Sequence, residues 1–304
     1  MADAAGGGIA VVVLTHDSAA DVAGCLESIR RSTVPAEVVV VDNASSDESR
    51  EVVQRCCPEA RVIASPRNLG FSAAANIGVR ASRAGFVMLL NPDARLAPGA
   101  LEALALFLSA RPGAAAVGPL VRNPDRTVQP SKRAFPTLWQ SAMHGIVGLV
   151  WPGNPGTRAY LLADAPLDRP ARVGWLSCSA VMLRREAFEK VGGFDERFFF
   201  FVEDVDLCRR LSDAGWELWF DPGAEAEHAW GGTWTQKPLR NLWLHHANLM
   251  RYALKHRRGA SALAAPVIAA GLALRFTLLA IRWLLARRAL PPHASGRSPK
   301  GASS

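Results

Sequence analysis

Two groups of carboxylates could do chemistry, and the first group follows apolar runs of the kind that lie inside a sheet. Asp93 comes after the run Phe86–Leu90 and the turn-forming pair Asn91-Pro92, and Asp42 ends the run at residues 38–41. Carboxylates bind Mg²⁺ or Mn²⁺, often with substrate phosphates completing the coordination shell. Asn, Pro and Asp also form ordinary turns and helix caps. The residues alone leave a metal-binding turn and a solvent turn open.

The second group is Glu203, Asp204 and Asp206, which follow the four phenylalanines at 198–201. A positioned carboxylate can take a proton from a substrate hydroxyl as a general base. Acidic residues in the first turn of a helix also stabilise that helix by complementing its dipole. Both interpretations fit here, because the apolar spacing that follows predicts a helix ending near Gly215.

The elements that position the first group are short apolar runs typical of buried parallel strands. Helices are expected between them, with Ser18 and Asp21 as a capping box for a helix that ends at about Ser32. Strands that alternate with helices predict an α/β fold with a mostly parallel sheet. The expected strands are residues 9–15, 37–42, 61–64 and 86–90, and two more helices are expected from about residue 45 and over 72–83.

In sheets of this kind, ligands bind beyond the carboxyl ends of the strands. The polar residues expected at that edge are Thr15, His16, Asp42, Asn43, Asn68, Gly70, Asn91 and Asp93. The sequence has no GxGxxG or P-loop pattern, which disfavours dinucleotide and Walker-type phosphate binding. A nucleotidyltransferase would need a Gly- and Lys/Arg-rich loop after its first strand, and LTHDSAAD is not one.

The cysteines indicate a reducing environment. Five are present, without paired metal-ligand spacing, at positions 25, 56, 57, 178 and 208. An odd number of thiols, together with an N-terminus that does not resemble an export signal, predicts reduced cysteines in the cytosol.

The second half of the chain is less regular than the first. Pro- and Gly-rich segments from residue 119 to 170 predict long loops over the sheet, and Val173–Leu183 predicts one further strand. The net charge of +8 belongs to the C-terminal quarter, because twelve Lys/Arg and no acidic residue follow Glu227. That asymmetry predicts an anionic partner for the tail.

Two helices are expected in this tail. Residues 238–258 predict a basic amphipathic helix, and residues 262–290 a more apolar one that Arg275 and Arg282 interrupt. A bilayer-spanning helix needs about twenty apolar residues without central charges, so both helices are expected to lie in the interface of an anionic membrane. Packing on the domain or in a homodimer is the alternative, and the apolar content disfavours nucleic acid. Residues 291–304 are expected to be disordered.

An ordered set of motifs resembles the family 2 glycosyltransferases. The motifs are VVVLTHDS, VVVVDNASSDES, PRNLGFSAAANIG, FVMLLNPDARL, GWLSCSAVMLRREAFEKVGGFDERFFFFVEDVDLCRRL and AEHAWGG. Within that family the chain is most similar to bacterial rhamnosyltransferases of cell-wall polysaccharide assembly. The resemblance implies a GT-A fold, a nucleotide-sugar donor and inversion at the anomeric carbon. It implies a catalytic domain over 1–235, with a nucleotide-binding half (about 9–120) and an acceptor half (about 120–235), before the membrane-associating helices of 236–290.

The resemblance also implies roles for single residues on the donor side. Thr15 and His16 would lie in the first nucleotide-binding loop, and Asp42 would contact the base or ribose. The rest of the nucleotide pocket would be formed by Asn43, Asn68, Gly70, Asn76 and Asn91. Asp93 corresponds to the last residue of the family's DXD metal motif, in which Asn91 replaces the first carboxylate. Binding of Mg²⁺ or Mn²⁺ would therefore depend on Asp93, the diphosphate and His228, although His228 is equally compatible with a core or surface position.

On the acceptor side, Glu203 and Asp204 match the family's acidic motif, with Asp204 as the general base and Asp206 as a helix-dipole residue. Trp175 and Arg209 are candidates for the acceptor pocket. The implied substrates are dTDP-L-rhamnose and a polyprenyl-diphosphate-linked N-acetylglucosamine, used peripherally at the cytoplasmic face of a bacterial inner membrane. A family 2 transferase with another sugar, or a non-catalytic nucleotide-binding protein, are the alternatives.

Overall fold

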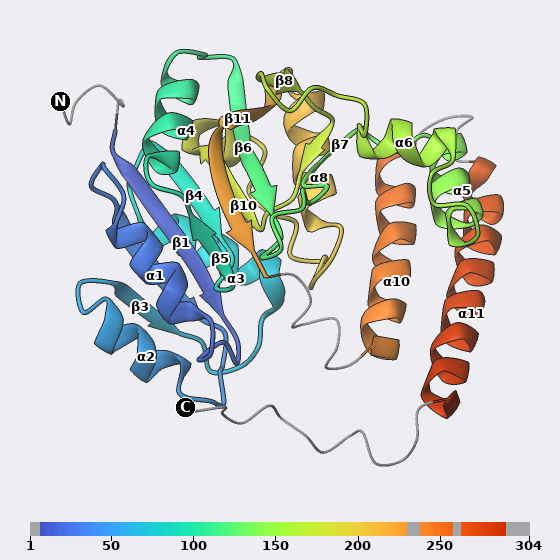
Figure 1. The fold of residues 1–304 in the computed structure, drawn as a ribbon, viewed down its shortest axis with the longest axis horizontal. Helices are drawn as coiled ribbons and strands as arrows, with labels where there is room; N and C mark the ends of the chain where they lie inside the picture. Colours follow the sequence, from blue (N-terminus) through green and yellow to red (C-terminus); the bar gives the residue numbers. More distant parts are fainter. Residues whose placement is uncertain (1–6, 230–237, 258–262, 290–304) are drawn as a thin grey trace. The chain divides into compact units, whose positions relative to one another are not determined.

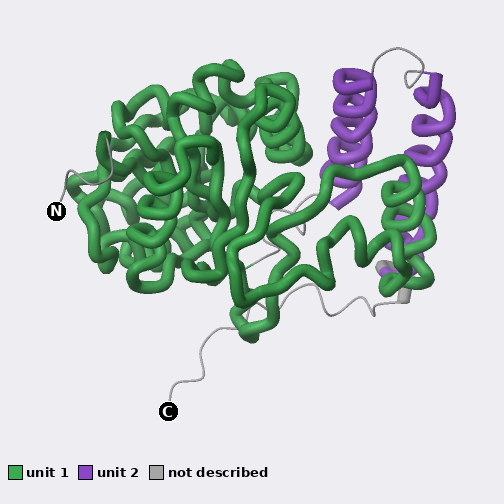
Figure 2. The backbone as a smooth tube through the Cα atoms, turned by 90° about the horizontal axis from the view of Figure 1, so that it is seen from above, with its two compact units in different colours: residues 1–236 green, residues 237–304 purple. Residues whose placement is uncertain are grey.

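The computed structural model describes residues 7–229, 238–257 and 263–289. The chain forms two compact units, residues 1–236 and 237–304 (Figure 2). The stretch 291–304, for which disorder was expected, lies outside the described residues.

The first half of unit 1 is a parallel sheet (Figure 1). Strands β1 (Ile9–Thr15), β2 (Glu37–Asp42), β3 (Arg61–Ala64) and β4 (Phe86–Leu90) pair in parallel in the order β3-β2-β1-β4. Helices α1 (Val22–Arg30), α2 (Ser49–Cys56) and α3 (Gly70–Ala81) connect them. The four strands have the bounds expected from the sequence, because each is a short, mostly apolar run between polar or turn-forming residues.

The second half extends this sheet with strands of both directions. β10 (Ala180–Arg184) pairs antiparallel with β4 and with β6 (Ala114–Arg122). β11 (Glu217–His228) runs parallel to β6 and antiparallel to β5 (Ala94–Leu96) and β8 (Ala171–Arg172). The result is a nine-stranded sheet in which eight strands follow the order β3-β2-β1-β4-β10-β6-β11-β5 and the ninth, β8, pairs with β11. Helices α4 (Ala100–Ser109), α7 (Arg185–Lys190) and α8 (Glu203–Asp213) belong to this half of the unit.

Both faces of the central strands are buried, which explains why their sequences are unbroken apolar runs. On one face, Val11 and Val13 belong to a core that α1, α2 and α4 cover. On the other face α3 approaches closely at Gly78, where an added Cβ would lie 2.4 Å from a methyl group of Val12. The small residues of α3 therefore let the helix lie directly on the sheet.

Three expectations about local structure were wrong. Helix α1 begins at Val22 without a side-chain cap, because the Ser18 hydroxyl donates to the His16 carbonyl group instead of closing a capping box. The segment 173–183 is two strands rather than one. β9 (Trp175–Leu176) pairs with β7 (Lys132–Arg133) in a separate small sheet, and β10 joins the main sheet.

The third error concerns the region from 119 to 170, which contains helices rather than only loops. α5 (Leu138–Gly145) begins with a capping box of Thr137 and Gln140. A 3₁₀ turn follows at Val147–Leu149, and α6 (Pro155–Leu161) begins at Asn154, whose side chain accepts a hydrogen bond from Thr157. Short capped helices between Pro and Gly residues lack the long apolar period that identifies helices in a sequence.

The described part of unit 2 consists of two packed helices, α10 (Pro238–His256) and α11 (Ala265–Ala289). A nitrogen of Arg275 lies 3.1 Å from Nε2 of His246, and the His246 ring packs edge-on against Phe276. Within the described residues, Ala265–Ala286 is long and apolar enough to cross a membrane by length and composition, which by itself is weak evidence.

Candidate active site

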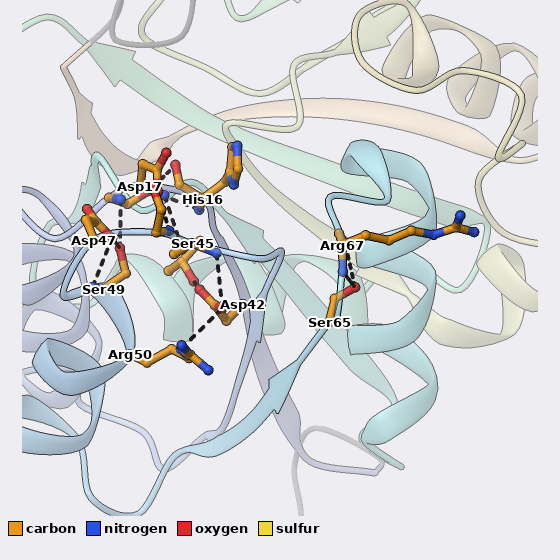
Figure 3. Close-up of polar contacts among 12 residues, drawn as sticks. His16, Asp17, Asp42, Ser45, Asp47, Ser49, Arg50, Ser65 and Arg67 are labelled. Carbon is orange, nitrogen blue, oxygen red and sulfur yellow. Dashed lines mark hydrogen bonds and ion pairs between the residues drawn. The ribbon is translucent and has the colours of Figure 1, made fainter.

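The ends of β1 and β2 are joined through the carboxylate of Asp42. Thr15 Oγ1 donates to Asp42 Oδ1 at 3.0 Å, and the Ser45 amide donates to Oδ2 at 3.3 Å (Figure 3). Arg50 Nε lies 3.7 Å from the same Oδ2. Asp42 is therefore a buried charge with three fixed partners at the carboxyl edge of the sheet, where its position is set by two strands.

The loops after β1 and β2 are held together by two further carboxylates, those of Asp17 and Asp47. Asp17 Oδ1 accepts from the amide and hydroxyl of Ser46, and Asp47 Oδ2 accepts from the amide of Ala19. The hydrogen bond from the Ser46 amide lowers the pKa of Asp17. His16 is exposed, and its imidazole points away from these contacts (Figure 3). The two loops thus form one preorganised rim beside Asp42.

The β2 and β3 ends meet through Asn43 and Asn68. The side-chain Nδ2 of Asn43 donates to Asn68 Oδ1 and to the Gly70 carbonyl group, both at 3.1 Å, and Asn43 Oδ1 accepts from the Leu69 backbone amide. Gly70 has φ +81°, and an added Cβ would lie 2.3 Å from the Phe199 carbonyl oxygen. Only glycine fits this position without displacing the phenylalanine segment.

That phenylalanine segment, residues 198–201, is fastened to the start of α3. The Phe71 amide donates to the Phe199 carbonyl group at 2.7 Å, and Ser72 Oγ donates to the Phe198 carbonyl group at 2.6 Å. Asn76, which was expected in the nucleotide pocket, uses both of its amide atoms on the turn before this segment: Nδ2 donates to the Phe194 carbonyl group, and Oδ1 accepts from the Phe194 amide. The structure therefore places Asn76 in the support of the phenylalanine segment.

Asn91-Pro92-Asp93 is the turn between β4 and β5. Because β5 pairs with the end of β11, the register sets Ala94 opposite His228 and brings Asp93 next to the imidazole. Asp93 Oδ1 lies 3.1 Å from His228 Nε2, and the side-chain Nδ2 of Asn91 lies 3.3 Å from the same atom. The three residues that the sequence assigned to this part of the site are thus within direct contact.

Gln129 holds His228 on its other side, a contact that the sequence did not indicate. Gln129 Oε1 lies 3.0 Å from His228 Nδ1, and Gln129 Nε2 donates to the His228 carbonyl group at 2.7 Å. A histidine that ligates a metal usually donates its other ring N–H to such an acceptor. An imidazole nitrogen and a carboxylate oxygen that face one another fit a divalent cation. Within the described residues, no cluster of three or more His, Cys, Asp or Glu side chains suited to a metal occurs.

The acidic pair lies at the first turn of α8, after two strained residues. Phe201 and Val202 have φ of +70° and +72°, a conformation that is uncommon outside glycine and that concentrates at functional sites. Glu203 is buried, and its Oε2 makes no hydrogen bond within the described residues. Asp204 is partly exposed, and its Oδ1 accepts from the Val205 amide at 2.8 Å.

Burial sets the protonation of this pair. The loss of water and the charge of Asp204 raise the pKa of Glu203 well above its ordinary value. Loss of water also raises the pKa of Asp204 to about 6, although the Val205 amide and the positive charge of Arg133 lower it in part. A buried neutral acid beside a partly exposed carboxylate of near-neutral pKa suits proton transfer.

Arg133 is positioned by aromatic rings. Its guanidinium carbon lies 4.7 Å from the Trp175 ring centroid and 5.7 Å from that of Tyr160, and its Nε donates to the Pro130 carbonyl group. Trp175, which was predicted for the acceptor pocket, is buried and supports Arg133. The sequence did not indicate Arg133 or Tyr160, because their signal is a contact between segments that are not adjacent in the chain.

Two other residues of α8 are engaged elsewhere. Arg209 Nε donates to Asp213 Oδ1 at 2.8 Å. Asp206, interpreted from the sequence as a helix-dipole residue, does lie in the first turn of α8. It is also fully buried and receives a 2.8 Å ion pair from Arg210 Nε, which gives it a packing role as well.

The segment 177–179 connects the two parts of the site. The backbone amide of Asn91 donates to the Ser179 carbonyl group at 2.9 Å. The neighbouring thiol of Cys178 has its pKa raised by burial and by the charge of Asp204. This short segment therefore contacts the Asn91–Asp93 turn and lies within electrostatic range of Asp204. The candidate metal-binding residues and the acidic pair thus lie in one region of unit 1.

The sheet order and the strand-end site define a GT-A fold, which solved structures share. GalNAc-T7 with UDP, GalNAc and Mn²⁺ has a TM-score of 0.58 at 15% identity, covering 94% of this chain and 59% of that one. A mannosyltransferase from Pyrobaculum calidifontis in complex with GDP-Man and Mn²⁺ has a TM-score of 0.57 at 18% identity, covering 93% and 79%. At these identities the likeness concerns the fold.

The family follows from the sequence matches. The model of glycosyl transferase family 2 matches residues 10–192, and that of glycosyl transferase family group 2 matches residues 162–295. The N-acetylglucosaminyl-diphospho-decaprenol L-rhamnosyltransferase of Mycobacterium tuberculosis is 39% identical over 249 residues, 78% of this chain and 80% of that protein. The chain belongs to glycosyl transferase family 2, and it is a glycosyltransferase with the predicted α/β fold.

Proposed function

We propose that the protein transfers L-rhamnose from dTDP-L-rhamnose to a polyprenyl-diphosphate-linked N-acetylglucosamine, with inversion at the anomeric carbon. The observation that carries the proposal is the partly exposed Asp204, whose pKa of about 6 leaves it mostly ionised at neutral pH. The choice of sugar and acceptor is supported by the 39% identity to the mycobacterial rhamnosyltransferase.

In the proposed reaction, Asp204 accepts the proton of the acceptor hydroxyl as its oxygen forms a bond to the anomeric carbon. The bond from that carbon to the diphosphate oxygen breaks, and the nucleoside diphosphate leaves with the bonding electrons. Glu203, neutral beside Asp204, adds no second negative charge at the site. The rigid start of α8 holds the base in place, and alignment of this kind supplies much of the rate of such a reaction.

On the donor side, the nucleotide would bind at the rim formed by Thr15, His16, Asp42 and Asn43, with Asn68 and Gly70 shaping the adjoining loop. Asp93 and His228 would hold a divalent cation, which offsets the negative charge of the diphosphate. Their nitrogen and oxygen donors favour Mn²⁺ over Mg²⁺, because Mg²⁺ prefers oxygen ligands.

We also propose that residues 236–290 bind the cytoplasmic face of the membrane that carries the acceptor lipid. The excess of Lys/Arg in this region and its apolar helix α11 support this placement. A lipid-linked acceptor diffuses in the bilayer, so an enzyme held at the surface meets it in two dimensions. A homodimer through the same helices is the competing use of this unit.

A donor panel tests the assignment. The full-length protein is incubated with dTDP-rhamnose, UDP-, GDP- and other dTDP-sugars, Mn²⁺ or Mg²⁺, and a short polyprenyl-diphosphate-GlcNAc acceptor, and products are read by mass spectrometry. The expected product is the acceptor plus one deoxyhexose, from dTDP-rhamnose only. A product from another donor would replace the rhamnose assignment, and no product from any donor would favour a non-catalytic nucleotide-binding protein.

A further inference from the structure

Gln129 lies at the end of a tight hairpin that packs against the last residue of β11. The hairpin closes through a hydrogen bond from the Asn123 backbone amide to the Thr127 carbonyl group. The Gln129 backbone amide donates to the Val121 carbonyl group at 2.9 Å. The Gln129 side chain is buried, with 7% of its surface exposed. Such a burial of an amide requires that its polar atoms find partners.

A directional chain of hydrogen bonds runs through this hairpin. Asp125 is a carboxylate and can only accept, so Thr127 Oγ1 donates to it at 2.6 Å. Thr127 Oγ1 therefore accepts from the side-chain Nδ2 of Asn123 at 2.8 Å, and Asn123 Oδ1 is left to face Gln129. Gln129 Nε2 donates to that oxygen at 2.6 Å and also to the His228 carbonyl oxygen, another obligate acceptor.

The chain fixes the tautomer of His228. Because both hydrogens of the Gln129 amide are used, the atom that faces His228 Nδ1 is Oε1, which can only accept. His228 Nδ1 must then carry the hydrogen, and a neutral His228 has its lone pair on Nε2. That lone pair faces Asp93 Oδ1 at 3.1 Å. Two acceptor atoms at this distance repel each other, and a proton or a metal cation between them removes the repulsion.

We propose that Gln129 is a positioning residue that holds His228 as an Nδ1–H tautomer, so that Nε2 and Asp93 bind a divalent metal together. The inference rests on the proposed function, in which this metal neutralises the donor diphosphate. It goes beyond it by assigning the metal affinity to a hairpin, residues 122–129, that is not part of the strand-end rim. Loss of such a supporting hydrogen bond typically lowers metal affinity by about 10- to 100-fold.

The test uses two Gln129 variants of the full-length protein. Gln129→Met removes the acceptor and should weaken Mn²⁺ binding in the presence of dTDP by about 10- to 100-fold, measured by electron paramagnetic resonance of free Mn²⁺. Gln129→Glu keeps an acceptor for Nδ1–H but loses both hydrogen bonds that Nε2 donates, so it should bind Mn²⁺ more tightly than Gln129→Met does. Binding of dTDP without metal should be the same in all three proteins, which separates metal affinity from a general loss of structure.

Arg126→Asn is the matched control on the same hairpin. It removes an ion pair to Glu225 but leaves the chain of hydrogen bonds, and asparagine tolerates the positive φ of residue 126. This variant should bind Mn²⁺ normally. A second comparison uses His228→Ala, in which Gln129→Met should have no further effect on Mn²⁺ affinity, because the residue it positions is gone.

The tautomer is measured separately by ¹⁵N NMR of the histidine rings, with His228→Ala to assign the signal. An Nδ1–H pattern in the metal-free protein that is lost in Gln129→Met is the expected result. An Nε2–H pattern at neutral pH, a Gln129→Met protein with unchanged Mn²⁺ affinity, or no Mn²⁺ binding by the unchanged protein would each overturn the inference. Failure of the donor panel with intact Mn²⁺ binding would instead overturn the proposed reaction alone.

Discussion

At the scale of single residues, the protonation of the acidic pair is a balance between burial and nearby charge. Burial raises the pKa of both Glu203 and Asp204, while Arg133 opposes the shift at Asp204 only. The two carboxylates therefore differ in charge although they are neighbours in the chain. Pairs of titratable groups whose environments separate their pKa values are typical of acid–base catalysis.

The pH dependence of turnover follows from this balance. A base acts when ionised, so activity should rise with pH through about 6, the pKa of Asp204. Arg133→Gln removes the positive charge that lowers this pKa, so the acid limb of the kcat profile should move to higher pH. Arg133→Lys should move it less.

Arg30→Gln is the control for that experiment, because Arg30 is exposed on α1, where it forms an ion pair with Glu59. Its acid limb should stay in place. An Arg133→Gln profile that coincides with that of the unchanged protein would show that Arg133 does not act on the base.

Glu203 should reduce stability at neutral and alkaline pH. Its pKa is raised by folding, so the stability it contributes is complete below the ordinary value of about 4.5 and is lost as pH rises through the raised value. Glu203→Gln should therefore melt at a higher temperature than the unchanged protein at pH 8, and the difference should shrink toward pH 4.5. Glu51→Gln, at an exposed position on α2, should show no such pH-dependent difference.

At the scale of elements, the parallel strands could be predicted from sequence because each is a short, mostly apolar run that precedes polar or turn-forming residues. The strand ends carried the polar residues that the structure brings together, including Asp42 with Thr15 and Asp93 with His228. Gln129 and Arg133 could not be predicted in the same way. Each acts through a partner about 70 to 100 positions away in the chain, and no local pattern encodes such a contact.

The supporting role of Asn76 was missed for a similar reason. The family motif places it beside Gly70, but only the fold shows that its amide serves the turn at Phe194, 118 positions later. The failure at Val173–Leu183 is different: both of its strands are apolar, and the break between them comes from pairing with two separate sheets.

Gly70 tests how tightly α3 and the phenylalanine segment are coupled. Gly70→Ala combines a left-handed φ with a clash at the Phe199 carbonyl oxygen, so it should destabilise the fold by about 1–3 kcal/mol or more and reduce both nucleotide binding and turnover. The measurement is urea unfolding together with calorimetry of dTDP binding.

Gly99→Ala is the matched control, since Gly99 has φ +77° but open space around an added Cβ. It shares the backbone strain without the clash, so it should leave nucleotide binding unchanged. Equal loss of nucleotide affinity in both variants would argue against a specific coupling through Phe199.

At the scale of the whole molecule, charge is divided between the two units. After Glu227 the chain has twelve Lys/Arg and no acidic residue. Helix α11 includes a stretch that is apolar enough to enter a membrane. Truncation after Lys237 should release the protein from anionic liposomes, and binding of the full chain should weaken as salt rises, because part of it is electrostatic. Co-sedimentation at low and high salt measures both effects.

Three outcomes would contradict interfacial binding. Association that resists both salt and alkaline washing would indicate that α11 spans the bilayer. Absence of binding would favour helices packed on the domain. A concentration-dependent doubling of mass that the truncation abolishes would favour a homodimer.

The measurement that most directly tests the account is the turnover of Asp204→Asn with dTDP-rhamnose and the lipid-linked acceptor. Asparagine keeps the size of the side chain but cannot accept the proton, so kcat should fall by about two to four orders of magnitude. Affinity for dTDP should change little, because Asp204 is not among the residues proposed to bind the nucleotide. Asp206→Asn should instead lower stability, since it leaves the half-buried Arg210 without its ion pair. An Asp204→Asn protein that retains near-normal turnover would contradict the central claim that Asp204 is the base.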